Sequence, residues 1–221
     1  MDIRNKELVV KGIGKISTSP DIIVIEMTLN VVDLEYNQTM QRSTKLIDRL
    51  RNAVQTAGHD GKSLKTTNFN IGTEYDRYQD KNVWKNRFVG YACNHDLRLE
   101  FDLYMEILGE TLSAIVGSDA KPKLKIRFSI KDPTAVSEEL LKNAIENAKW
   151  KAGVLAKSAG VTLGDIQRID YNWSDIRFYS DTMYDMKEAV FENALSVPMS
   201  MDIEPENIDV KDTATVVWSI Q

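Results

Sequence analysis

Apolar and polar residues alternate along the first part of the chain in the pattern of β-strands that bury one face. Residues 8–16 and 22–32 both carry this pattern, and the second run is apolar at nearly every other position. Pro20 and Asp21 lie between the two runs, and both are typical turn residues. We therefore expect the two strands to form an antiparallel hairpin that turns at this point.

Further strands are expected along the rest of the chain. The runs 64–78 and 87–101 are joined by the polar stretch 79–82, which predicts a long hairpin. In its second strand alternate residues from Leu97 onward point inward, whereas His95 is expected on the polar or edge side. The remaining predicted strands are 123–131, 165–173 and 209–221.

Three segments have apolar residues at helical spacing: 35–57, 102–116 and 133–159. Each is followed by a glycine that can end a helix, namely Gly58, Gly117 and Gly160. The longest of the three begins with a proline and carries an alanine-rich stripe, so we expect it to lie close to a sheet.

These elements predict an α+β fold, with a mainly antiparallel sheet and two long helices packed on one face. The stretches 57–70 and 159–172 share a helix end, a glycine stop, a turn and a strand, which indicates an internal αβ repeat. The length of 221 residues fits a single domain spanning 1–221, divisible into sub-units 1–102 and 103–221.

Gly12 and Gly14 raise the question of a phosphate-binding loop. A dinucleotide fingerprint needs a third glycine and a helix that opens directly behind it, whereas Ser17 and a strand follow here. We expect the two glycines to permit a β-bulge or the close approach of another backbone segment.

Charge and composition exclude some classes of partner. Lys and Arg number 28 against 33 Asp and Glu, so the net charge of −5 gives no general attraction for nucleic acid, and none is expected as a partner. The basic row of the strand 123–131 could bind RNA, but pairing with Glu26 or Glu100 on the same sheet is the simpler interpretation.

The N-terminus lacks the apolar core of a signal peptide, and no run approaches 18 apolar residues, so we expect no membrane span. The chain as written is therefore predicted to be cytoplasmic, and periplasmic or exported if a signal peptide has been removed. Cys93 is the single cysteine, which excludes a disulfide within the chain.

Candidate catalytic residues are few. Beyond Cys93 the chain has only His59 and His95 as typical nucleophile or base candidates, and it contains no metalloprotease, serine-hydrolase, P-loop or kinase motif. We therefore expect no enzymatic activity, no metal site built on the histidines and no cofactor.

The polar and aromatic segment 174–195 is the main candidate for binding. Exposed aromatic and methionine side chains are typical of interfaces, although the same residues could cover the edge of the core. The partner-binding candidates are Phe178, Tyr179, Met183 and Tyr184. The acidic residues could instead gather a divalent cation or face solvent, and the metal-binding candidates among them are Asp181 and Asp185, flanked by Asp175 and Glu188.

Four stretches of the chain, in this order, resemble the SIMPL domain family, a group of unknown function that includes bacterial periplasmic immunogenic proteins. They are the opening V-x-G-x-G with Pro-Asp and a long strand (9–32), the G-Y-x-A-x-N strand (90–94), the alanine-spaced helix with its following strand (144–169), and the closing strand (202–220). The matching motif residues are Gly12, Gly14, Pro20, Asp21, Gly90, Tyr91, Asn94 and Gly160.

The resemblance implies an α+β domain that forms higher oligomers, including rings, with roles in envelope protection or oxidative stress tolerance in bacteria and no catalytic residues. We therefore expect a self-associating, non-enzymatic protein that acts through homo-oligomeric assembly or through a protein partner. The alternative is a small-ligand or cation binder that uses an acidic, aromatic groove near Asp181 and Asp185.

Overall fold

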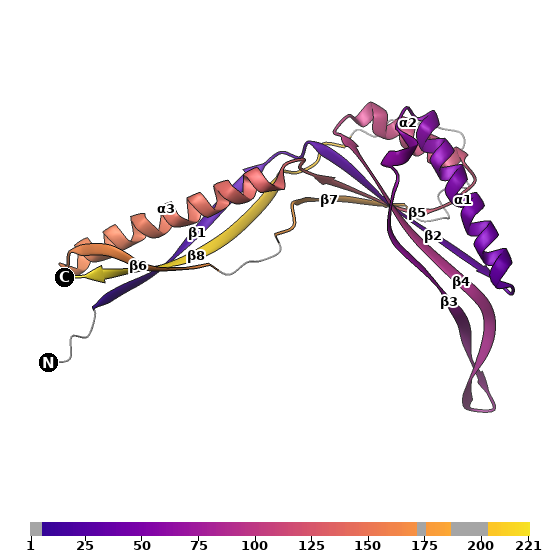
Figure 1. The fold of residues 1–221 in the computed structure, drawn as a ribbon, viewed down its shortest axis with the longest axis horizontal. Helices are drawn as coiled ribbons and strands as arrows, with labels where there is room; N and C mark the ends of the chain where they lie inside the picture. The colour runs from indigo at the N-terminus through magenta and orange to yellow at the C-terminus, as the bar shows by residue number, and fades with distance from the viewer. Residues whose placement is uncertain (1–5, 172–175, 187–202) are drawn as a thin grey trace. The chain divides into compact units, whose positions relative to one another are not determined.

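The computed structural model describes residues 6–171, 176–186 and 203–221 (Figure 1). The chain divides into two compact units: unit 1 comprises 1–20, 129–181 and 206–221, and unit 2 comprises 21–128 and 182–205. This division differs from the sub-units 1–102 and 103–221, because each unit gathers segments that are far apart in the sequence.

Unit 1 is built on a three-stranded antiparallel sheet with the strand order β1 (Glu7–Thr18), β8 (Ile208–Ile220), β6 (Leu163–Tyr171). Helix α3 (Pro133–Ala159) runs along β1 and β8 (Figure 1). The Asp132 side chain accepts a hydrogen bond from the Ala135 N–H at the start of α3, and Gly160 adopts the left-handed conformation just past its end. The sequence-predicted limits of this helix are therefore confirmed.

Gly12 and Gly14 allow α3 to lie directly against β1. A Cβ atom on Gly12 would overlap the Ala144 carbonyl oxygen, and one on Gly14 would overlap the Leu140 carbonyl oxygen. The facing side of the helix consists largely of buried alanines, including Ala148. The expected close approach of another backbone is confirmed, and β1 continues as a strand through Gly14 with no helix behind it.

The expected hairpin between the first two strands is wrong. Strand β1 pairs with β8 along its whole length, whereas β2 (Ile22–Asp33) pairs with β4 (Val83–Asp102). Pro20 is the last residue of its segment of unit 1 and Asp21 the first of unit 2. Proline ends a ladder, but the turn composition does not specify which strand becomes the partner, and both strands find better partners later in the chain.

Unit 2 is built on a five-stranded sheet with the order β3-β4-β2-β5-β7, in which β3 and β2 both pair antiparallel with β4. Its other elements are helix α1 (Tyr36–Thr56), a 3₁₀ turn η1 (Gly61–Ser63), strand β3 (Lys65–Asp80), helix α2 (Met105–Gly117), strand β5 (Lys123–Ser129) and strand β7 (Tyr179–Met186).

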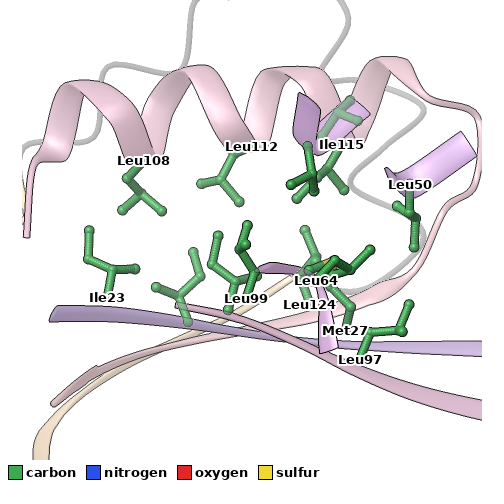
Figure 2. Close-up of a cluster of buried hydrophobic side chains, with 14 of the residues drawn as sticks. Ile23, Met27, Leu50, Leu64, Leu97, Leu99, Leu108, Leu112, Ile115 and Leu124 are labelled. Atoms are coloured by element: carbon green, nitrogen blue, oxygen red, sulfur yellow. The ribbon is translucent and has the colours of Figure 1, made fainter. Parts of the chain in front are cut away.

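The core of unit 2 lies between this sheet and the helices α1 and α2. Figure 2 shows Leu108 and Leu112 of α2 pointing toward Ile23 and Leu99 of the sheet, and Leu50 of α1 belongs to the same cluster. All five side chains are fully buried, so this cluster supplies much of the hydrophobic stabilisation of unit 2.

Both units have the same topology. In unit 2 the elements β2, α1, β3 and β4 follow one another, and β4 returns to lie between β2 and β3. In unit 1 the elements β1, α3, β6 and β8 occur in the same order, although elements of unit 2 lie between β1 and α3 and between β6 and β8, and β8 returns to lie between β1 and β6. The α+β class is confirmed, and the two long helices belong to two sheets, one in each repeat.

Candidate interaction surface on the β3–β4 arm

The hairpin of β3 and β4 extends beyond the rest of its sheet. Strand β2 ends at Asp33, which pairs with Tyr91, so β4 has only β3 as a neighbour on the stretch before Tyr91 (Figure 1). We call residues 75–88 the arm. Lys81 and Asn82 at its tip both have positive φ angles, of 46° and 65°, as a two-residue type I′ turn requires.

The arm has two chemically different faces. Tyr75 pairs with Phe88 and Gln79 with Trp84, which places these side chains and Arg77 on one face. We call Tyr75, Arg77, Trp84 and Phe88 the aromatic face. The opposite face carries two ion pairs, Arg87–Asp76 at 3.3 Å and Lys85–Asp80 at 2.6 Å.

Ring contacts connect the aromatic face to the body of unit 2. The rings of Tyr36 and Tyr91, of Tyr91 and Phe88, and of Phe88 and Tyr75 meet edge to face, with centroids 5.6–5.7 Å apart. Further out, the guanidinium carbon of Arg77 lies 5.2 Å from the centre of the Trp84 ring. The aromatic face is thus an extension of the inner face of the sheet.

Helix α1 covers this inner face only up to its own first residue, Tyr36. Close to that end, the Thr39 hydroxyl donates to the Tyr91 carbonyl oxygen at 3.1 Å, and the Cys93 thiol donates to the Ser43 hydroxyl at 3.3 Å. Thr39, Ser43 and Cys93 are all buried. Beyond Tyr36 the arm is uncovered within the described residues, and Trp84 is 57% exposed.

Each of the two histidines has a threonine hydroxyl as a hydrogen-bond partner. His95 lies on the inner face, two residues before Leu97, and is 8% exposed, so its expected position on the polar side is wrong. Its Nε2 lies 2.8 Å from the Thr66 hydroxyl, and His59 Nε2 lies 2.7 Å from the Thr111 hydroxyl. Burial lowers the pKa of both imidazoles. Each ring therefore serves as a partly or fully buried hydrogen-bonding group.

The predicted partner-binding residues occupy different environments. Phe178 is buried in a cluster of unit 1 that includes Ile130 and Ile208, so it is a core residue. Tyr179 is half-buried, whereas Met183 and Tyr184 are exposed at neighbouring positions of β7. A role for these last two residues in partner binding stays a prediction.

The predicted metal ligands are too far apart to share one cation. Asp181 and Asp185 both lie in β7, where a separation of four residues corresponds to about 13 Å. In the described parts of the chain, no group of three or more potential ligands is arranged to hold a metal ion. The flanking Asp175 and Glu188 lie outside the described residues. The geometry therefore gives no support to the cation-binding alternative.

The glycine–tyrosine motif at 90–94 lies at the root of the arm. A Cβ atom on Gly90 would overlap the Asp33 carbonyl oxygen, so glycine allows the close approach of the α1 entry loop. The Tyr91 ring joins the chain of ring contacts, and the Asn94 side-chain oxygen accepts a hydrogen bond from Asn30 at 2.6 Å. The sequence signal for the arm is the density of aromatic residues in 75–88, a stretch for which the sequence pattern predicts only a hairpin.

Comparison with known proteins identifies the family of the chain. The family model described as "SIMPL: Protein of unknown function (DUF541)" matches residues 8–218. The chain belongs to the SIMPL family. The resemblance inferred from the sequence motifs is therefore confirmed.

Two relatives of this SIMPL protein show how far the similarity extends. The "26 kDa periplasmic immunogenic protein" of Brucella melitensis is 28% identical over 175 residues, which cover 76% of this chain and 68% of that protein. The "Uncharacterized protein YggE" of Edwardsiella ictaluri is 22% identical over 218 residues, covering 96% of this chain and 86% of that protein. Among the described residues, every helix is too short or too polar to cross a membrane.

Proposed function

We propose that this SIMPL protein is not an enzyme and works by assembly, with the β3–β4 arm as the surface through which one copy associates with others. The observation that carries the proposal is the aromatic face, which continues the covered inner face of the sheet but is itself exposed. Such a surface is typical of a protein whose apolar residues are buried only in a complex.

The exposed area is large enough to matter energetically. Tyr36, Tyr75, Trp84 and Phe88 are each 41–57% exposed, which leaves about 100 Å² of each ring in water. Burial of these four rings would contribute about 10 kcal/mol. Association costs about 4–15 kcal/mol in lost freedom of motion, so these four rings alone give weak binding, and a stable assembly needs additional contacts.

The two-stranded structure of the arm is a second argument for association. An isolated β-hairpin is only marginally stable in water, and residues 75–88 have no third strand and no helix over them in the described chain. Contact with another copy would supply the missing layer. The core of unit 2 does not require an arm of this length, and association gives the length a role.

The site of action is the bacterial periplasm, and envelope protection or stress tolerance is the role in this proposal. The support comes from the relatives in Brucella melitensis and Brucella abortus, whose names describe periplasmic proteins. Fractionation of the native host with an antibody against the chain tests the location, and recovery only with cytoplasmic markers would contradict it.

The test of assembly uses two exposed tryptophans. Trp84 of the arm is 57% exposed and Trp150 of α3 in unit 1 is 66% exposed, so they form a matched pair. Light scattering behind a sizing column, at high micromolar concentration, should show an oligomer for the wild type and for Trp150→Ser. Trp84→Ser, combined with Tyr75→Ser, should shift the protein to a monomer without a change in circular dichroism. A strictly monomeric wild type, or equal loss of assembly in both variants, would overturn the proposal.

A further inference from the structure

The four edge strands of the two sheets differ in how their free backbone groups are protected. At the edge of β1, the Asn147 side chain accepts a hydrogen bond from the Ile13 N–H at 3.0 Å, and Lys151 donates to the Lys11 carbonyl oxygen at 3.0 Å. Strand β6 has two register shifts against β8, and β7 is only 8 residues long. Capping, irregularity and shortness are all ways in which proteins prevent edge-to-edge pairing.

Strand β3 has none of these protections along most of its length. It is 16 residues long, and its own extra residue lies at Thr67; the second register shift of the β3–β4 ladder, between Glu74 and Tyr75, has its extra residue, Val89, in β4 and not in β3. Within the described residues, the hydrogen bonds of its first half, from Thr66, Thr67 and Asn68, run to β4, and no side chain caps its backbone from outside the sheet. An open, regular edge of this length is a template for another strand.

Building on the proposed function, we infer that two copies meet by antiparallel pairing of β3 with β3 of the second copy, centred on Thr73. A two-fold axis perpendicular to an antiparallel pair places one residue opposite itself and every other residue opposite its mirror position. The charges along β3 therefore decide which centres are allowed, because like charges directly opposite each other are destabilising.

Most other centres place like charges opposite each other, and centres at Phe69 or Asn70, which do not, leave residues 76–80 without a partner residue in β3. Centres at Glu74, Asp76 or Arg77 place a charge opposite its own copy, and a centre at Tyr75 places Glu74 opposite Asp76. A centre at Tyr78 opposes two aspartates, and one at Ile71 opposes Arg77 to Lys65. A centre at Gly72 avoids like charges, but it pairs two residues that have no side chains. A centre at Thr73 instead pairs two β-branched side chains.

The Thr73 centre also gives favourable neighbours on the inner face. Phe69 lies opposite Arg77 of the second copy, and Ile71 lies opposite Tyr75 of the second copy. These are a cation–π pair and an aromatic–aliphatic pair, both of which stabilise neighbouring strands. The pairing joins two sheets into one and sets the aromatic face of each arm beside Phe69 and Ile71 of the other copy. It also supplies the backbone hydrogen bonds that the aromatic face alone lacks.

A cross-linking experiment tests the register. Opposite side chains in an antiparallel pair have Cβ atoms about 4.5–5.5 Å apart, so Thr73→Cys should link to its own copy through a short bis-maleimide. Gln79→Cys is the control, because its opposite residue would be Thr67. Since pairing holds the two thiols at a high local concentration, Thr73→Cys should form dimers about tenfold faster than Gln79→Cys. Cys93 is retained because it is fully buried.

The outcomes separate this inference from the proposed function. An oligomer on the sizing column in which Thr73→Cys links no faster than Gln79→Cys overturns the β3 pairing and leaves assembly through the arm intact. Faster linking by Gly72→Cys than by Thr73→Cys overturns the register. A strictly monomeric wild type overturns both proposals.

Discussion

The two units share one topology but differ in how much of the sheet is covered by a helix. In unit 1, α3 has 27 residues, so it is about 40 Å long and matches the length of the 12-residue strand β1 beneath it. In unit 2, α1 has 21 residues and is about 31 Å long, whereas the 20 residues of β4 reach about 66 Å. The same order of elements thus gives one covered sheet and one sheet with a long uncovered hairpin.

The contact between helix and sheet differs in the same way. Gly12 and Gly14 let the backbone of α3 touch β1, and side chains of α3 cap the β1 edge. In unit 2 the first half of α1 meets β4 through small polar residues such as Ser43 and Cys93, and the edge of β3 is open. We conclude that the lengths of the elements and the sizes of the contact residues, rather than the topology, make one repeat closed and the other suited to association.

The largest expected effect is the loss of the close packing in unit 1. Gly14→Val should lower the free energy of unfolding by about 3 kcal/mol, because the added side chain meets the backbone of α3 at Leu140. Gly153→Ala is the control, since its Cβ meets open space on the same helix and should stabilise by about 1 kcal/mol. Urea unfolding measures both, and equal effects of the two substitutions would contradict the packing of α3 on β1.

A fall in pH should lower the stability of unit 2 more than that of unit 1, because both histidines of the chain lie in unit 2. Burial lowers the pKa of His59 and His95 below the ordinary value of 6.5. Near His95, the Asp96 carboxylate opposes this shift and Arg51 adds to it. At a pH above 6.5 the rings are neutral in both states, and below it the unfolded chain binds protons first, so the stability of unit 2 should fall.

Hydrogen exchange, corrected for its intrinsic pH dependence, measures this difference. Peptides of unit 2 should lose protection as the pH falls below 6.5, while peptides of unit 1 keep theirs. His95→Gln, which retains a hydrogen-bonding side chain near Thr66, should reduce the slope. A parallel loss of protection in both units, or an unchanged slope in this variant, would show that the histidines do not control the effect.

The smallest expected effect concerns the protected edge of β1. Asn147→Ala removes the acceptor for the Ile13 N–H and should cost about 1 kcal/mol. Combined with Lys151→Ala, it should also open this edge and add self-association that does not depend on Trp84. Lys149→Ala on the same helix is the control. Unchanged light scattering of the double variant would contradict a protective role for these caps.

The local features of the fold were predictable from the sequence. Asp132, Pro133 and Gly160 mark the ends of α3 by rules that involve only neighbouring residues, and the prediction of its limits is confirmed. The position of His95 was also within reach, since it is separated by two residues from Leu97 and strand residues alternate between faces. The alternation of the strand, and not the polarity of the side chain, sets the face on which His95 lies.

The candidate surface was less predictable. The sequence drew attention to the segment 174–195, yet Phe178 is part of the core of unit 1, while the aromatic residues of the hairpin are exposed. Tyr75 and Trp84 have the same composition signal as Phe178. What separates them is whether a helix lies over the strand, and no local pattern contains that information.

By itself the sequence determined the helices, all the strands of the described residues except β7, the need for glycine at positions 12 and 14, and membership of the SIMPL family. These follow from periodicity, capping and side-chain size, which act between residues close in the chain or at a single contact. The tertiary structure alone decided that β1 pairs with β8, that the two repeats interleave along the chain, and that the arm is left uncovered. Strand pairing and coverage depend on competition between segments far apart in the sequence, so they are settled only when the whole chain has folded.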